Sequence, residues 1–113
     1  ERPKSVRTIE IAGRRIDFER REATLDGGRV VALSEREAEV LHFLAANPGR
    51  AVSRDELLQR VWGLDPRGVQ TRTVDMTIAR LRELLGDDPE NPSVITTVRA
   101  KGYMLARATE GSA

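Results

Sequence analysis

The sequence predicts one α+β domain, in which a meander of short strands is followed by three helices and a closing β-hairpin. Three observations support this fold class. Apolar residues alternate with polar ones near the amino terminus, recur at helical spacing through the middle, and alternate again near the carboxy terminus. The chain has 113 residues, 39% of them hydrophobic, which is enough for the core of a single domain.

The alternating segment near the amino terminus spans residues 8–33. Its apolar members are Ile9, Ile11, Ile16, Phe18, Ala23 and Leu25. Turn signals separate the runs, first at Ala12-Gly13 and then at Asp26-Gly27-Gly28. Short alternating runs divided by glycine turns are typical of antiparallel hairpins, so we expect a meander of three or four strands here.

Two helix starts follow, each marked by a serine with a glutamate three residues later. Ser34 and Glu37 form the first pair, and Ser53 and Glu56 form the second. This pattern is a capping box, in which the two side chains satisfy free amide groups at a helix start. We expect the first helix to end at Asn47-Pro48-Gly49 and the second to end near Trp62-Gly63.

The third helix is predicted over residues 71–85, and its two faces differ in character. Val74, Ile78, Leu81 and Leu85 form a narrow apolar stripe that can dock onto a core. The opposite side is small and arginine-tipped, and carries Arg72, Thr73, Met76, Ala79, Arg80 and Glu83. A face of this kind fits into a groove of another molecule, although an ordinary amphipathic surface helix has the same pattern. We expect Gly86 to end the helix in a left-handed conformation.

The alternation returns over residues 95–105 and predicts a hairpin with a basic tip. Thr97 and Arg99 share one face, and the tip is expected at Ala100-Lys101-Gly102. Two helices followed by such a hairpin indicate a winged helix-turn-helix. In this motif the last helix enters the major groove of DNA and the hairpin flanks it.

Composition narrows the possible functions. The net charge of +1 argues against a globally basic nucleic-acid binder, but all except two of the 19 basic residues are arginine. Arginine offers a planar fork for phosphates and guanine edges. The chain has no cysteine, its only histidine, His42, has no visible second ligand, and no apolar run is long enough to span a bilayer. We therefore expect no enzyme, metal site, cofactor or membrane association.

Three segments together resemble a known family. They are LSEREAEVLHFLAANPGRAVSRDELLQRVWG (33–63), RTVDMTIARLRELL (72–85) and TTVRAKGYML (96–105). In this order, after a strand meander, they resemble the OmpR/PhoB-type winged-helix effector domain of bacterial two-component response regulators. The resemblance implies an amino-terminal four-stranded antiparallel sheet, three helices and a carboxy-terminal hairpin wing. We expect the domain to span residues 8–107, with a linker end at 1–7 and a polar tail at 108–113.

The resemblance also implies sequence-specific binding of promoter DNA, and it assigns residues to that role. The recognition helix would use Arg72, Thr73, Met76, Thr77 and Arg80, and the wing would use Thr97, Arg99 and Tyr103. From their positions alone, Arg82 on the helix and Lys101 at the wing tip are further candidates for DNA contact. Some assignments stay open. Arg82 could pair with Asp75 instead of a phosphate, Thr77 could lie at the core edge, and Tyr103 could be a packing residue with a polar tip.

Partners follow from the same resemblance. The loop after the second helix, here Trp62, Gly63, Leu64, Asp65 and Arg67, is where family members commonly meet RNA polymerase. Such domains usually follow a receiver domain, act in the cytoplasm, and bind direct repeats of double-stranded DNA as head-to-tail dimers. An alternative is a winged-helix module that binds protein and has little DNA affinity.

The near-neutral net charge and Glu83 keep that alternative open. The chain departs from the family pattern at three positions. The wing tip has Ala100 where the family often has glycine, and alanine tolerates a positive φ poorly. Glu83 and Ala79 stand where the family often has basic residues. We therefore expect weaker non-specific DNA affinity than is usual for the family.

Overall fold

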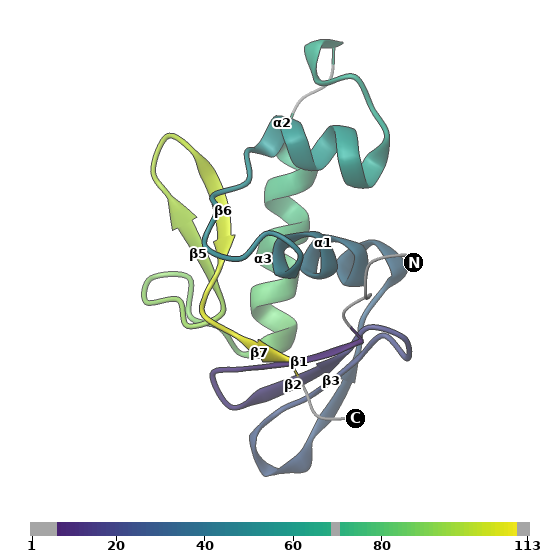
Figure 1. The fold of residues 1–113 in the computed structure, drawn as a ribbon, viewed down its shortest axis with the longest axis vertical. Helices are drawn as coiled ribbons and strands as arrows, with labels where there is room; N and C mark the ends of the chain where they lie inside the picture. Colours follow the sequence, from purple (N-terminus) through teal and green to yellow (C-terminus); the bar gives the residue numbers. More distant parts are fainter. Residues whose placement is uncertain (1–6, 69–70, 111–113) are drawn as a thin grey trace.

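An antiparallel sheet forms one layer of the molecule (Figure 1). The computed structural model describes residues 7–68 and 71–110. The strands of the sheet are β1 (Thr8–Ile11), β2 (Arg14–Asp17), β3 (Glu22–Thr24), β4 (Val30–Ala32) and β7 (Thr109–Glu110), in the order β4-β3-β2-β1-β7. Ile9 pairs with Ile16, and Ile16 with Ala23, so one apolar row crosses three strands and faces the core.

The four amino-terminal strands confirm the predicted meander, but the sheet also has a fifth strand. Glu110 pairs with Ile9 and Thr109 pairs with Glu10, antiparallel to β1. The segment predicted as a polar tail from residue 108 thus includes two strand residues. Two residues carry too little alternation to reveal a strand in the sequence. Residues 111–113, and residues 1–6 of the expected linker end, lie outside the described residues.

Three helical segments follow the meander, as predicted. They are α1 (Glu35–Ala45), α2 (Arg54–Leu57) with its continuation η2 (Leu58–Trp62), and α3 (Arg72–Leu85). Both serine caps form, since Ser34 accepts from the Glu37 amide and Ser53 from the Glu56 amide. The Glu37 side chain completes its capping box, whereas the Glu56 carboxylate pairs with Arg50 at 2.8 Å.

Two features near the helices refine the prediction. The second helix ends as expected at Gly63, which is left-handed with a φ of 70°, but its last turn, η2, is π-helical. Two short 3₁₀ turns, η1 (Asp26–Gly28) and η3 (Pro66–Gly68), lie in the connections.

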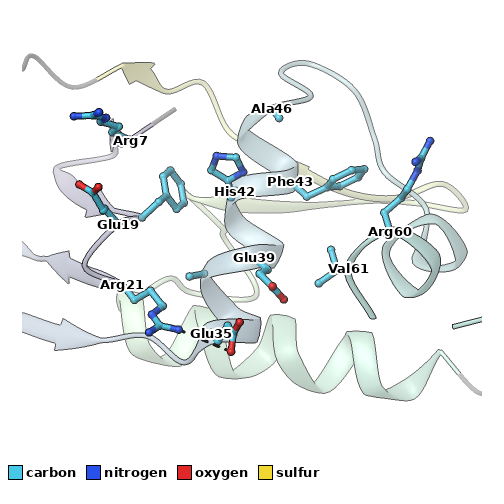
Figure 2. A pocket seen from close by; sticks show the side chains of 12 residues that line it. Arg7, Glu19, Arg21, Glu35, Glu39, His42, Phe43, Ala46, Arg60 and Val61 are labelled. Carbon is cyan, nitrogen blue, oxygen red and sulfur yellow. Dashed lines mark ion pairs between the residues drawn. The ribbon is translucent and has the colours of Figure 1, made fainter. Parts of the chain in front are cut away.

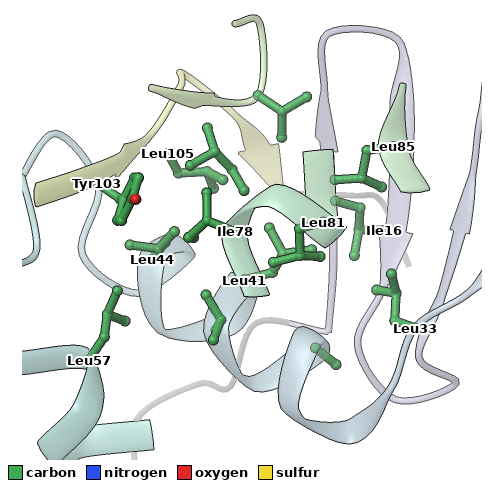
Figure 3. Close-up of a cluster of buried hydrophobic side chains, with 14 of the residues drawn as sticks. Ile16, Leu33, Leu41, Leu44, Leu57, Ile78, Leu81, Leu85, Tyr103 and Leu105 are labelled. Carbon is green, nitrogen blue, oxygen red and sulfur yellow. The ribbon is translucent and has the colours of Figure 1, made fainter. Parts of the chain in front are cut away.

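The core lies where α1 and α3 meet the sheet and the hairpin (Figure 3). The predicted stripe of α3, Val74, Ile78, Leu81 and Leu85, is at most 1% exposed, which confirms that this face docks inward. Gly86 ends α3 in the predicted left-handed conformation, with a φ of 66°. The inward face of α3 therefore fixes which side chains of this helix point outward.

The wing consists of β5 (Ile95–Val98) and β6 (Gly102–Leu105), paired as an antiparallel hairpin. The extended piece before α2 holds it, because Val52 and Tyr103 exchange backbone hydrogen bonds of 2.7 and 2.9 Å. At Gly102 the approach is so close that a Cβ would lie 2.0 Å from the Val52 carbonyl oxygen. Only glycine fits there. Ala100, at the tip, adopts a positive φ of 65°.

Candidate nucleic-acid interface

The outward face of α3 carries the side chains that the sequence placed there. Arg72, Thr73, Met76, Ala79, Arg80 and Glu83 are all exposed. Met76 is 62% exposed and is one of only three large hydrophobic residues exposed in the described part of the chain. An exposed methionine between arginines on a helix offers both apolar and cationic contacts.

Arg80 pairs with Glu83 one turn further along α3. Its Nη1 lies 3.1 Å from Glu83 Oε1, and the two side chains are 59% and 73% exposed. An exposed ion pair of this kind contributes little to stability, so a phosphate or a base edge can replace the carboxylate at low cost. The pair also offsets the unfavourable charge that Glu83 brings to this face.

Thr77 lies at the edge of the core. It is half-buried, and its hydroxyl donates to the Thr73 carbonyl oxygen of its own helix at 3.0 Å. Its polar group is therefore already engaged, whereas the Thr73 side chain beside it is exposed.

Arg82 ties α3 to the wing. Its Nη2 donates to the Ile95 carbonyl oxygen at 2.7 Å and to Thr97 Oγ1 at 2.9 Å. The pairing of Arg82 with Asp75, which the sequence left open, is wrong, because the described partners of Asp75 are Arg54 and Tyr103. Thr97, which the sequence assigned to the wing surface, is exposed but already accepts from Arg82.

Tyr103 points into the molecule. It is 5% exposed, and its hydroxyl donates to Asp75 Oδ1 at 2.6 Å. Burial alone would raise the pKa of Asp75, but the hydrogen bonds from Tyr103 and Arg54 outweigh it and hold this pKa below its ordinary value. Burial and the bond to Asp75 raise the pKa of Tyr103. Asp75 is thus held as a carboxylate and Tyr103 as a neutral donor.

The tip of the wing presents two cations. Arg99 and Lys101 are both exposed on the turn between β5 and β6. Figure 1 shows the hairpin beside α3, with its tip directed toward the end of the molecule where α2 lies. The hairpin that carries the predicted basic tip therefore lies beside the predicted recognition helix, to which Arg82 ties β5.

Arg54 is a further cation at this surface that the sequence analysis missed. It is the first residue of α2, its side chain is 43% exposed, and its Nε donates to Asp75 Oδ1 at 2.6 Å. The hydrogen bond to Asp75 raises the pKa of its guanidinium. The serine cap at Ser53 already marked a helix start at this position, and the amino terminus of a helix favours anions.

Comparison with known proteins identifies the family. The family model described as "Transcriptional regulatory protein, C terminal" matches residues 28–105, more than half of the chain. The chain belongs to this family of OmpR/PhoB-type effector domains.

Solved structures of the family align over most of the chain. The DNA-binding domain of RstA from Klebsiella pneumoniae, solved in complex with the RstA box, is 40% identical, with 88% of this chain and 96% of that chain covered and a TM-score of 0.76. The effector domain of BfmR from Acinetobacter baumannii is 39% identical, with 98% and 100% covered and a TM-score of 0.71.

A longer relative aligns over only part of its length. The response regulator DrrB from Thermotoga maritima, an OmpR/PhoB homologue, is 34% identical, with a TM-score of 0.76. The alignment covers 89% of this chain but 45% of DrrB.

In this OmpR/PhoB-type domain, the loop expected to meet polymerase is anchored at its start. Trp62 is half-buried, and the Arg36 guanidinium lies 5.3 Å from the centroid of its ring. Arg36 also donates to the Val61 carbonyl oxygen at 2.6 Å. Beyond Gly63 the loop is exposed: Leu64 is 41% exposed, and Asp65 pairs with Arg67 at 2.8 Å.

His42, the only histidine of the chain, lies in an aromatic environment. It is half-buried on α1 and meets Phe18 edge to face, with ring centroids 5.0 Å apart. Both residues line an open hollow, and Figure 2 shows His42 on α1 within it. Within residues 7–68 and 71–110, no group of three His, Asp or Glu side chains is placed to hold a metal ion. No helix in these ranges is long and apolar enough to cross a membrane.

Proposed function

We propose that this domain binds double-stranded promoter DNA in a sequence-specific manner, as the output domain of a response-regulator transcription factor. In this proposal α3 enters the major groove and the wing enters the adjacent minor groove. The observation that carries it is the outward face of α3, where Arg80 and Met76 are exposed opposite a fully buried apolar stripe. That face has the width and the chemistry of a recognition helix.

Each exposed side chain has a distinct role in this proposal. Arg80 exchanges Glu83 for the O6 and N7 atoms of a guanine, and Met76 meets a thymine methyl group. Arg72, near the start of α3, neutralises a phosphate. Arg99 and Lys101 enter a narrow minor groove, where the negative potential is strongest. Arg54 adds a phosphate contact from the start of α2.

The proposed partners extend beyond the DNA itself. The RstA domain, a relative of this chain, was solved with the RstA box, which supports a specific duplex as the ligand. DrrB is more than twice as long as the aligned segment, which supports a receiver domain in the full-length regulator. We further propose head-to-tail dimers on direct repeats, a contact between Leu64 and RNA polymerase, and a cytoplasmic location.

A protein-binding module without DNA affinity has less in its favour. That alternative relied on the near-neutral charge and on Glu83, whose carboxylate is paired with Arg80. Retention on random-sequence DNA at low salt separates the two functions, because a module that only binds protein should pass through.

The test of the proposed function compares two arginines of α3. The ligand is a duplex selected from a randomised pool by the wild-type domain, and fluorescence anisotropy at several salt concentrations reports affinity. Arg80→Ala is expected to cost about 1–3 kcal/mol of binding free energy and to relax base preference. Arg72→Ala is expected to weaken all sequences and to reduce the salt slope by about one.

Arg20→Ala serves as the matched control. Arg20 lies in the turn between β2 and β3, 77% exposed, and its replacement removes the same charge away from α3. If Arg80→Ala and Arg20→Ala have equal effects on affinity and on base preference, α3 is not the reading element.

A further inference from the structure

One side-chain cluster joins the three elements that surround the proposed DNA-binding surface. Asp75 of α3 accepts two hydrogen bonds on the same oxygen, from the Tyr103 hydroxyl of β6 and from Arg54 Nε of α2, each 2.6 Å long. The Arg54 and Arg82 guanidinium groups lie 5.4 and 5.8 Å from the centroid of the Tyr103 ring. We name Arg54, Asp75, Arg82 and Tyr103 the Tyr103 cluster.

The bond between Tyr103 and Asp75 is of a strong kind. A hydroxyl that donates to a carboxylate makes a charge-assisted hydrogen bond, which is about twice as strong as a neutral one. Tyr103 is 5% exposed, so packing as well as this bond holds its side chain in place. The bond spans 28 residues of sequence and joins the wing to the recognition helix.

The rest of the cluster strengthens the same connection. Arg82 of α3 donates to Ile95 and Thr97 of β5, so both strands of the wing are tied to α3 by side chains. The base of the hairpin is also held by Ile95 and Leu105 in the core. Arg99 and Lys101 lie beyond these attachments. Their distance from Arg80 therefore depends on how rigidly the middle of the hairpin is held.

We infer that Tyr103 and Asp75 are positioning residues, which set the wing relative to α3 so that the two elements engage adjacent grooves of DNA together. This inference rests on the proposed function. The family resemblance implied that Tyr103 contacts DNA. In this inference Tyr103 instead holds the wing in place from inside the domain. A wing held in its binding geometry before DNA arrives has less freedom to lose on binding, and Arg99 then contributes its full contact energy.

A double-mutant cycle tests this coupling. The affinity of the selected duplex is measured for the wild type, Arg99→Ala, Tyr103→Phe and the double variant. Phenylalanine keeps the ring and removes only the hydroxyl. Arg99→Ala is expected to weaken the wild type about tenfold but the Tyr103→Phe background about twofold, because a loosened wing no longer delivers Arg99. Arg80→Ala should weaken both backgrounds by the same factor, since the core holds α3 in each.

Two further variants separate positioning from loss of stability. Asp75→Ala removes the acceptor from the other side of the bond and should shrink the Arg99→Ala effect in the same way. Ser34→Ala removes the cap at the start of α1 and lowers stability, but leaves the bond between Tyr103 and Asp75 in place. In that background Arg99→Ala should keep its full effect. Thermal unfolding of every variant confirms that it is folded at the assay temperature.

The outcomes distinguish this inference from the proposed function. An equal Arg99→Ala penalty in the wild-type and Tyr103→Phe backgrounds overturns the positioning role and leaves DNA binding intact. The positioning role is also overturned if the loss of affinity caused by Arg99→Ala is as small in the Ser34→Ala background as in the Tyr103→Phe background. If no duplex is selected, or if Arg80→Ala and Arg99→Ala both leave affinity unchanged, the proposed function fails and the inference fails with it.

Discussion

Two residues at the wing tip, Ala100 and Gly102, have positive φ angles, and substitution is expected to affect stability in opposite directions at the two positions. Ala100 has a φ of 65°, where an alanine Cβ is strained. Gly102 has a φ of 142° and lies against the Val52 carbonyl, where no Cβ fits. The departure from the family pattern at Ala100 therefore leaves the turn intact but strains its backbone. At Gly102, by contrast, glycine is required.

Exchanging the residue types at these two positions tests this reading. Ala100→Gly is expected to raise the free energy of unfolding by about 0.5–1 kcal/mol, the relieved strain less the extra chain freedom of glycine. Gly102→Ala is expected to lower it by about 2–4 kcal/mol, because the strand must move away from Val52. Denaturant unfolding measures both. A neutral Gly102→Ala would mean that the wing does not pack against the strand piece at Val52.

For individual side chains, the sequence predicted solvent exposure better than it predicted hydrogen-bond partners. A helical wheel placed Met76 and Arg80 outward because periodicity is a local property. It could not show that Asp75 binds Tyr103 and Arg54, since these residues are far apart in the chain and meet only after folding. Tyr103 was open between packing and contact for the same reason.

Among the elements, α3 is held at its carboxy end by the sheet. Arg14, the first residue of β2, donates from Nε to the Leu85 carbonyl oxygen at 2.7 Å and from Nη2 to the Gly86 carbonyl oxygen at 2.9 Å. A cation that binds the last carbonyls also suits the negative end of the helix dipole. The sheet thereby fixes the end of α3 that lies away from α2.

Removing this cap gives a prediction for the element as a whole. Arg14→Ala is expected to lower the free energy of unfolding by about 1–2 kcal/mol, because two helix carbonyls lose their donor. Arg20→Ala, which removes an arginine from the turn after β2, should change it by less than about 0.5 kcal/mol. If Arg14→Ala and Arg20→Ala change the free energy of unfolding equally in chemical denaturation, Arg14 does not cap α3.

The loop after α3 shows what sequence patterns omit about connections. Asp87 is 4% exposed and accepts hydrogen bonds from the amides of Ser93, Val94 and Ile95. It shapes the loop that delivers β5 to its place beside α3. Gly86 predicted the end of α3 but not the internal organisation of the loop that follows. The fifth strand and the π-helical turn were likewise absent from the periodicity, because each is too short to produce a repeat.

For the molecule as a whole, the arrangement of charge matters more than its total. The net charge is +1, yet Arg54, Arg72, Arg80, Arg99 and Lys101 lie on α2, α3 and the wing. The sheet forms the other end of the molecule in Figure 1, and its exposed surface mixes both signs, as in the pair of Arg15 and Glu10. We expect DNA to meet only the first of these two surfaces.

Amide chemical shifts of the isotope-labelled domain, followed as the selected duplex is added, test that claim most directly. We expect the largest shifts over residues 72–80 of α3 and 99–101 of the wing, with β2, β3 and β4 almost unchanged. Shifts concentrated on those strands or on the hollow around His42, with α3 unaffected, would contradict the account.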